Sequence, residues 1–234
     1  WEANLSKIYW STNLSRNPLS KSAMAKLISG PAKKKLTTVE KEVINYKKAL
    51  DFITSEWLVS EKSIQPKTIL DIYSLACSGK FRDNEATLRQ ILNYLQTSSE
   101  NPVIPAGSAM IHLVKLAPFT AENDKIGRLV SLLFLYKAGY DFRGMLYLEE
   151  HFRRDLTTWQ QIAQIPGGNL TPWLEYFALG ITNQLQKALA GITDNTTPTN
   201  MPTSFWELND RQKEVLKTLE QPNISITNKA LRKH

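Results

Sequence analysis

Apolar residues recur at helical spacing along most of this 234-residue chain. The clearest stretch runs from about 38 to 59, where the apolar residues lie three or four positions apart: Val43, Tyr46, Leu50, Ile53 and Trp57. That spacing puts their side chains on one face of a helix, as expected for a helix that buries one side. No stretch alternates between apolar and polar residues with a period of two. The sequence therefore predicts an all-α fold with little or no sheet.

Residues that favour helix ends predict the other elements. Pro66 suits the first position of a second helix, and Asn84 is a candidate N-cap for a third. Pro105 is expected to open a fourth helix. The next one, at 127–139, begins with a Gly-Arg pair, is apolar on several faces and ends at Gly139, so we expect it to be the central, most buried helix. Later helices are expected at about 149–165 and 171–190.

Composition and charge exclude several classes of protein. The single cysteine, Cys77, cannot form an internal disulfide or a cysteine metal cluster, which fits a cytoplasmic location. The longest apolar run, 129–136, is much shorter than the roughly 18–20 residues of a membrane span, so we expect no membrane contact. The net charge of +7 is divided among separate basic clusters, which favours a solvated surface over a nucleic-acid groove. These clusters are 31–36, 151–155 and 229–234.

A change of composition predicts the domain organisation. Residues 192–204 are rich in Thr, Asn and Pro, which is typical of a linker. The linker would separate a helical domain at 1–191 from an appendage at 205–234 with two short helices. Two short helices bury little surface by themselves, so the appendage is expected either to dock on the main domain or to begin a further module.

Residues 117–128, "APFTAENDKIGR", align without gaps with HPFx[D/E]GNGRxGR, the signature of the Fic (Fic/Doc) family. The resemblance implies a Fic-like helical bundle, whose members typically transfer AMP from ATP to a protein hydroxyl. It extends over most of the chain, and 208–220 resembles the first helix of the winged-helix module that many members carry. The other matching segments are 13–20, 39–53, 136–155 and 168–181.

The departures from this signature fall on the residues that carry the chemistry. Ala117 stands where the family has its general base, a histidine, and cannot accept a proton. Ala121 stands at the acidic position that holds Mg²⁺, so we expect no metal site. Glu122 and Asp124 replace two glycines that let the backbone approach the phosphates, and Lys125 replaces an arginine. The retained residues shape the loop: Pro118, Phe119, Asn123, Gly127 and Arg128.

Two further departures concern regulation and substrate docking. Many family members carry an inhibitory Ser-x-x-x-Glu motif whose glutamate pairs with the last arginine of the signature. The matching stretch is 11–16, which places Ser15 at the glutamate position. The family also has a β-hairpin flap that docks the target chain. Only 79–86 separates the two helices concerned, which is too short for a hairpin with useful strands. We therefore expect the flap to be reduced or absent.

Other residues are candidates for roles at this site. His112 lies five residues before Ala117, about 140° away around the helix, and is expected to be structural. His151 on a later helix is an alternative base, and Trp159 is an alternative wall for a nucleotide base. Both are expected instead to have structural roles. Glu122 and Asp124 form an alternative cation site.

These observations predict a degenerate Fic-like protein that lacks standard AMP transfer and acts through protein binding or regulation. We expect a protein partner, allow for a homodimer, and expect no cofactor. The alternative is an enzyme of unusual mechanism that binds ATP with Mg²⁺, or another phosphorylated ligand. Its candidate ligand-binding residues are Asn123, Lys125, Gly127 and Arg128. A DNA-associated role is disfavoured, because the chain as given ends before a recognition helix forms.

Overall fold

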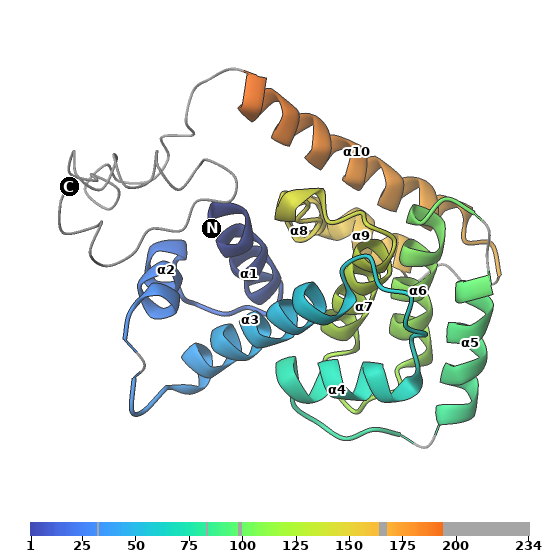
Figure 1. Ribbon diagram of the computed structural model, residues 1–234, viewed down its shortest axis with the longest axis horizontal. Helices are drawn as coiled ribbons and strands as arrows, with labels where there is room; N and C mark the ends of the chain where they lie inside the picture. Colours follow the sequence, from blue (N-terminus) through green and yellow to red (C-terminus); the bar gives the residue numbers. More distant parts are fainter. Residues whose placement is uncertain (32, 83, 98–99, 164–167, 194–234) are drawn as a thin grey trace. The chain divides into compact units, whose positions relative to one another are not determined.

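The computed structural model describes residues 1–193 except 32, 83, 98–99 and 164–167. Within this part the elements are all helical, as the sequence predicted, and no strand is present (Figure 1). They are α1 (Glu2–Leu14), α2 (Lys21–Ser29), α3 (Thr38–Trp57), α4 (Pro66–Ala76), α5 (Glu85–Thr97), α6 (Val103–Leu116), α7 (Asn123–Lys137), the short 3₁₀ helix η1 (Phe142–Gly144), α8 (Glu149–Arg154), α9 (Leu156–Ala163) and α10 (Thr171–Thr193).

Local sequence signals account for several helix starts. Thr37 caps α3, because its hydroxyl accepts from the backbone N–H of Glu40 while the Glu40 carboxylate accepts from the N–H of Thr37. Pro66 occupies the first position of α4, as expected. Asn84 does not cap α5 as predicted: its side-chain oxygen has no hydrogen-bond partner, and only its backbone carbonyl accepts from Leu88. The Asn84 side-chain oxygen therefore accepts no capping hydrogen bond at the start of that helix.

Helix α7 is the centre of the fold, as the sequence predicted. It is buried from Lys125 to Tyr136 and packs against α3, α4 and α6 (Figure 1). Helices α6 and α7 form an antiparallel hairpin that meets closely at Gly127. A Cβ atom at Gly127 would lie only 3.1 Å from the backbone oxygen of Met110, so glycine permits this close approach.

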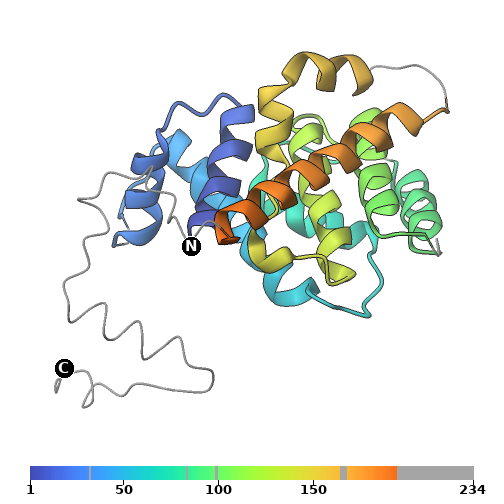
Figure 2. The same ribbon diagram turned by 90° about the horizontal axis from the view of Figure 1, so that it is seen from above.

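Aromatic side chains join α10 to the rest of the bundle. Trp173 donates a hydrogen bond from Nε1 to the carbonyl of Gly107 on α6, with an N–O distance of 2.7 Å. It also packs on Trp159 of α9, while Tyr176 packs on Phe152 of α8. Figure 2 shows α10 crossing the helices that carry these residues. Trp159 is thus a core residue, as expected.

Several element boundaries differ from the sequence predictions. Helix α6 begins at Val103 rather than at Pro105, and α7 begins at Asn123, one turn before the expected Gly-Arg pair. The helix expected at 149–165 is divided into α8 and α9, because Asp155 leaves the helical conformation, with φ −121° and ψ 50°. Helices α1 and α2 were not predicted from periodicity. The buried face of α1 includes polar residues, which hides the apolar pattern on which such a prediction depends: Ser6, Lys7, Ser11 and Thr12.

Residues Trp1–Ala188 form one compact unit. Helix α10 continues to Thr193, two residues into the segment predicted as a linker. The rest of that linker and the whole appendage at 205–234 lie outside the described residues. None of the described helices is long and apolar enough to cross a membrane.

Lys7 is a lysine buried in the core. Lys7 on α1 is 1% exposed, and its ammonium donates a hydrogen bond to the hydroxyl of Tyr136 on α7, with an N–O distance of 2.7 Å. Burial lowers the pKa of Lys7 to about 8, although the negative charges of Glu149 and Asp141 oppose this shift. The charged form of Lys7 therefore costs stability in the folded state.

Replacing Lys7 is expected to change how stability depends on pH. In the folded protein Lys7 loses its proton near pH 8, whereas in the unfolded chain it keeps it up to about 10.5. The free energy of unfolding of the unmodified protein should therefore rise by about 2 kcal/mol between pH 7 and pH 9.5 through this group. Urea unfolding of Lys7→Met and the unmodified protein should show the variant's relative stability falling by that amount over the same range. Lys67→Met, at an exposed lysine paired with Asp71, is the control and should show no such trend.

Candidate functional site

The loop between α6 and α7 is built on two left-handed residues. Ala117 ends α6 with φ 45° and ψ 59°, and Glu122 precedes α7 with φ 59° and ψ 29°. Side chains with a Cβ atom adopt this conformation at a cost of about 1–2 kcal/mol, so the surrounding contacts must hold the loop in place. The loop opens onto the N-terminus of α7, where free backbone N–H groups can bind an anion.

Asn123 and Phe119 fix the middle of the loop. The Asn123 side chain accepts from the backbone N–H of Phe119 at 3.0 Å and donates to its carbonyl at 2.9 Å. The ring of Phe119 is buried and stacks on Tyr73 of α4, with 3.6 Å between ring centroids. Asn123, predicted as a ligand-binding candidate, thus has its side-chain amide engaged in supporting the loop backbone.

A short segment before α5 pairs with this loop. The backbone N–H of Thr120 donates to the carbonyl of Lys80 at 2.9 Å, and the backbone N–H of Arg82 donates to the carbonyl of Pro118 at 2.8 Å. These bonds form a single antiparallel bridge between Phe81 and Phe119. No hairpin strand accompanies the bridge in the described part of 79–86. The expected reduction of the flap is therefore confirmed for those residues.

Lys125 is neutralised by two carboxylates. Its side chain is 1% exposed, and its ammonium lies 2.8 Å from a carboxylate oxygen of Glu42 on α3 and also contacts Glu122. Burial lowers the pKa of Lys125, but the hydrogen bonds that its ammonium donates to Glu122 and Glu42 outweigh this effect and raise it. The second Glu122 oxygen accepts from the backbone N–H of Ser78 at 2.6 Å. The Lys125 ammonium and the Glu122 carboxylate, which aligns with a glycine of the Fic signature, are thereby both paired within the chain.

Arg128 is also paired within the chain. Its side chain is 3% exposed, and Nη1 donates to the Asp124 carboxylate at 2.9 Å, one turn earlier on α7. Nη2 lies 3.4 Å from the hydroxyl of Ser11 on α1. The opposing charge therefore comes from Asp124. Ser15, at the position of the inhibitory glutamate, is exposed at the end of α1 and carries no carboxylate.

A groove of about 610 Å³ lies beside this loop, between α1, α3 and the end of α4. Its lining includes Ser15, Arg16, Thr38, Lys41, Glu42, Asn45, Cys77, Ser78, Glu122, Asp124 and Lys125. Burial raises the pKa of the Cys77 thiol to about 12, and the nearby Glu122 charge adds to the shift. Cys77 is thus a weak nucleophile in this groove at neutral pH.

The residues present do not fit a magnesium–triphosphate group. Ala121 offers only a methyl side chain, and its backbone oxygen lies 3.0 Å from the Tyr73 hydroxyl. The loop carboxylates Glu122 and Asp124 contact cationic side chains and add negative charge where three phosphates would need to bind. Within the described residues, no group of three or more His, Cys, Asp or Glu side chains could hold a metal ion.

Neither alternative histidine lines the groove. His112 on α6 lies with Nδ1 2.7 Å from the carbonyl of Ser108, one turn earlier. His151 on α8 packs on Tyr176 and against Gly180 of α10, where a Cβ atom would lie 2.6 Å from the imidazole ring. Burial lowers the pKa of His151, which favours a neutral ring. Both geometries agree with structural roles.

Sequence reasoning missed three residues that shape the site. Glu42, Tyr73 and Ser11 lie far from the loop in the sequence and reach it from three different helices. Ser11 was assigned to the inhibitory stretch, but its contact with Arg128 was not foreseen. Glu42 sits in a helix whose first turns are rich in glutamate, and no local signal marks it as the partner of Lys125.

Comparisons with known proteins agree with this fold. The sequence matches no family model and no curated protein. Among solved structures, a Fic domain containing signaling protein from Bacteroides thetaiotaomicron matches 83% of this chain and 88% of its own, with a TM-score of 0.67 and 15% identity. Fic-1 from C. elegans matches 82% of this chain and 64% of its own, with a TM-score of 0.67 and 19% identity. A Fic family protein from Desulfovibrio desulfuricans matches 99% of this chain and 74% of its own, with a TM-score of 0.66 and 16% identity.

These likenesses show that the chain has the Fic fold over most of its length. At identities of 15–19% they concern the fold alone. The match spans less than two thirds of the C. elegans chain.

Glycine at position 117 is expected to stabilise the protein. Ala117→Gly removes the strain of the left-handed conformation, which stabilises the folded state by about 1–2 kcal/mol. Glycine also raises the entropy of the unfolded chain, which destabilises the folded state by about 0.5–1 kcal/mol. The expected net gain in stability is therefore about 0.5–1 kcal/mol. Ala121→Gly is the matched control, because the φ of Ala121 is not positive and the same substitution there should only destabilise. Thermal unfolding measures both. An equal loss of stability in the two variants would contradict the strained conformation at Ala117.

The ion pair of Asp124 with Arg128 is expected to affect how the free energy of unfolding depends on pH under acidic conditions. Burial raises the pKa of Asp124, but Arg128 outweighs this and holds it below the ordinary 3.8. The stabilisation is therefore present at neutral pH and is lost as the pH falls below about 3.8. Asp124→Asn should lower the free energy of unfolding by about 1–2 kcal/mol at pH 7 and by little at pH 2.5. Asp71→Asn, in an exposed pair with Lys67, should cost under about 0.5 kcal/mol at either pH.

Proposed function

We propose that this chain is a degenerate Fic-fold protein that lacks AMP transfer and acts by binding another protein, as a regulator or scaffold. The observation that carries the proposal is the internal neutralisation of the loop cations. Lys125 is held by Glu42 and Glu122, and Arg128 is held by Asp124. The groups that would bind phosphates are therefore already paired.

The electrostatics of the loop oppose a triphosphate. A phosphate group that approached Lys125 would have to displace a carboxylate from a nearly buried ammonium, leaving that carboxylate without its partner. Breaking a buried pair in this way costs about 3–5 kcal/mol. The displaced Glu122 carboxylate would then lie beside an anionic ligand and repel it. Glycines at positions 122 and 124 would leave Arg128 without its carboxylate and Lys125 with Glu42 alone, so both cations would be more open to phosphate.

The loop also lacks a group that could carry the chemistry. The methyl group of Ala117 cannot accept the proton of a target hydroxyl, and general-base catalysis typically contributes about 10²–10⁴-fold in rate. Neither His112 nor His151 lines the groove. Ala121 supplies no carboxylate for the magnesium ion that would neutralise phosphate charge. AMP transfer would thus lack its base and its metal ligand together.

The contacts of Arg128 suggest why the inhibitory glutamate is missing. In many members of the Fic family, a glutamate at the position that matches Ser15 pairs with the last arginine of the signature. Here Asp124 supplies that carboxylate from the loop's own helix, and α1 contributes only the hydroxyl of Ser11. An arginine that is permanently paired needs no second carboxylate to restrain it. What remains of the site is a polar groove, which suits recognition of a partner protein.

Nucleotide binding tests the proposal. The unmodified protein should show no rise in melting temperature with ATP, ADP or AMP at millimolar concentration, with Mg²⁺ or Mn²⁺, and should label no protein of a cognate lysate from α-labelled ATP. Binding at 100 times the dissociation constant would add about 2.7 kcal/mol, which thermal unfolding detects readily. A nucleotide-dependent shift in the unmodified protein, or label transfer lost in Arg128→Ala, would overturn the proposal and favour the phosphate-ligand alternative.

Two loop variants separate the causes. Glu122→Gly with Asp124→Gly removes two of the three carboxylates that pair with the cations and leaves Glu42 beside Lys125, so this double variant should gain a thermal shift with ATP. Ala117→His restores a base but leaves the carboxylates, so it should gain none. The opposite pattern would show that the internal ion pairs are not what prevents binding.

A further inference from the structure

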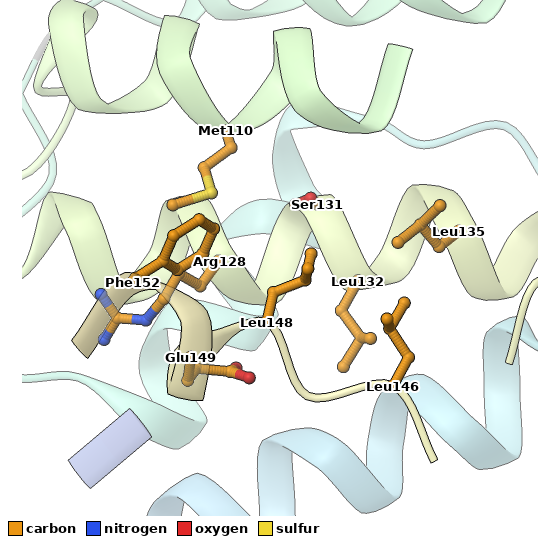
Figure 3. Close-up of a pocket in the computed structure, with 9 residues that line it drawn as sticks. All are labelled: Met110, Arg128, Ser131, Leu132, Leu135, Leu146, Leu148, Glu149 and Phe152. Carbon is orange, nitrogen blue, oxygen red and sulfur yellow. The ribbon is translucent and has the colours of Figure 1, made fainter. Parts of the chain in front are cut away.

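Helix α8 contacts both the interior of the bundle and α10. Two of its residues, Glu149 and Phe152, line a small cavity of about 20 Å³ together with Met110 of α6 and Leu132 of α7 (Figure 3). A third residue, His151, contacts α10 instead. Because α8 has only 6 residues, its place in the fold depends on these side-chain contacts.

The His151 ring packs tightly against α10. Its centroid lies 4.5 Å from that of the Tyr176 ring. A Cβ atom at Gly180 would lie 2.6 Å from Cδ2 and 3.1 Å from Nε2 of His151, so the missing side chain at Gly180 permits this approach. Nε2 is shielded from solvent and has no hydrogen-bond partner among the described residues. The contact therefore suits a neutral imidazole whose Nε2 carries no proton.

The other charged groups around this contact are paired or act elsewhere. Glu150 of α8 pairs with Lys187 of α10 at 2.9 Å and with Arg154 at 2.6 Å. Helix α9, which follows α8, carries no titratable side chain. Helix α1 also packs on α8, and its charged residues act on other groups: Glu2 on Tyr147, and Lys7 with Glu149 and Asp141.

Burial of the ring disfavours its charged form. The Asp155 carboxylate and the backbone of Tyr176 favour a protonated ring, but burial outweighs both and lowers the pKa of His151 below the ordinary 6.5. The unfolded chain therefore binds this proton more readily than the folded chain. The stability of the folded state is accordingly unaffected by this group above about pH 6.5, and it falls as the pH drops below that value.

We propose that His151 is an acid-sensitive switch for the docking of α10, which separates locally from α8 when the ring is protonated. The proton comes from solvent and binds at Nε2, and no covalent bond between heavy atoms changes. Separation at Tyr176 and Gly180 would let water reach the new charge. His112 is not part of the switch, because its Nδ1 contacts the carbonyl of Ser108 within its own helix. The switch rests on this contact and not on the proposed function, so either can fail while the other stands.

Hydrogen exchange of the backbone amides at pH 7.5 and pH 5 tests the switch. After correction for the intrinsic exchange rate, amides at 176–184 of the unmodified chain should lose protection by about threefold or more at pH 5. Amides of α3 should not change, which distinguishes local separation from global unfolding. His151→Gln, which stays neutral, should remove the difference, and His112→Gln should keep it. Unchanged protection of α10 in the unmodified chain, or an equal loss in α3 or in His151→Gln, would overturn the proposal.

The titration of His151, followed by nuclear magnetic resonance of the imidazole, tests the tight contact with α10. In the unmodified chain the pKa of His151 should lie below 6.5. Gly180→Ala adds a Cβ atom where the ring lies, so it should move the pKa of His151 back toward 6.5 and lower the protection of α10 at pH 7.5. Asn183→Ala, at an exposed position of the same helix, is the matched control and should change neither. An unchanged His151 titration in Gly180→Ala would contradict the contact on which the switch depends.

Discussion

The ion pairs of Lys125 and Arg128 hold the region around the loop together. Both cations project from the first turns of α7, the central helix, and both are almost fully buried. A buried cation must be paired, because removing charge from water costs several kcal/mol per ion. Glu42 and Glu122 meet this need for Lys125, and Asp124 meets it for Arg128. The positions of α3, the loop and the start of α7 all depend on these pairs.

Under the proposed function, the same pairs would explain how a Fic fold persists without AMP transfer. Residues that would otherwise bind phosphate cannot simply be left unpaired inside the protein. The two carboxylates that replace glycines supply counter-charges from within the loop, so the cations stay buried at little cost. Glu122 occupies a left-handed conformation that glycine adopts more easily, and its contacts with Lys125 and Ser78 help to offset that strain.

The groove beside the loop and the buried Arg128 side chain suggest two separate roles within this site. The groove beside α1 and α3 is open and lined by both polar and apolar residues, and under the proposed function a partner would reach the loop there. Arg128, in contrast, faces inward to α1 and α8 and is shielded from the groove. The pairing of 80–82 with 118–120 holds the loop from its other side. A loop restrained on both sides is better suited to present a fixed surface than to follow a reacting substrate.

The sequence by itself determined the helical class, the central place of α7, the long helix α3 and the residues missing from the loop. Each depends on local information: the period of apolar residues, a capping residue, or the identity of a side chain at a motif position. Only the tertiary structure decided that Glu42 pairs with Lys125, that Ser11 contacts Arg128 and that 80–82 bridges to the loop. Those contacts join residues 36 to 117 positions apart, and no local pattern records which groups meet. Helix α1 escaped prediction for the same reason, since two of its buried polar residues, Lys7 and Ser11, have their partners on α7.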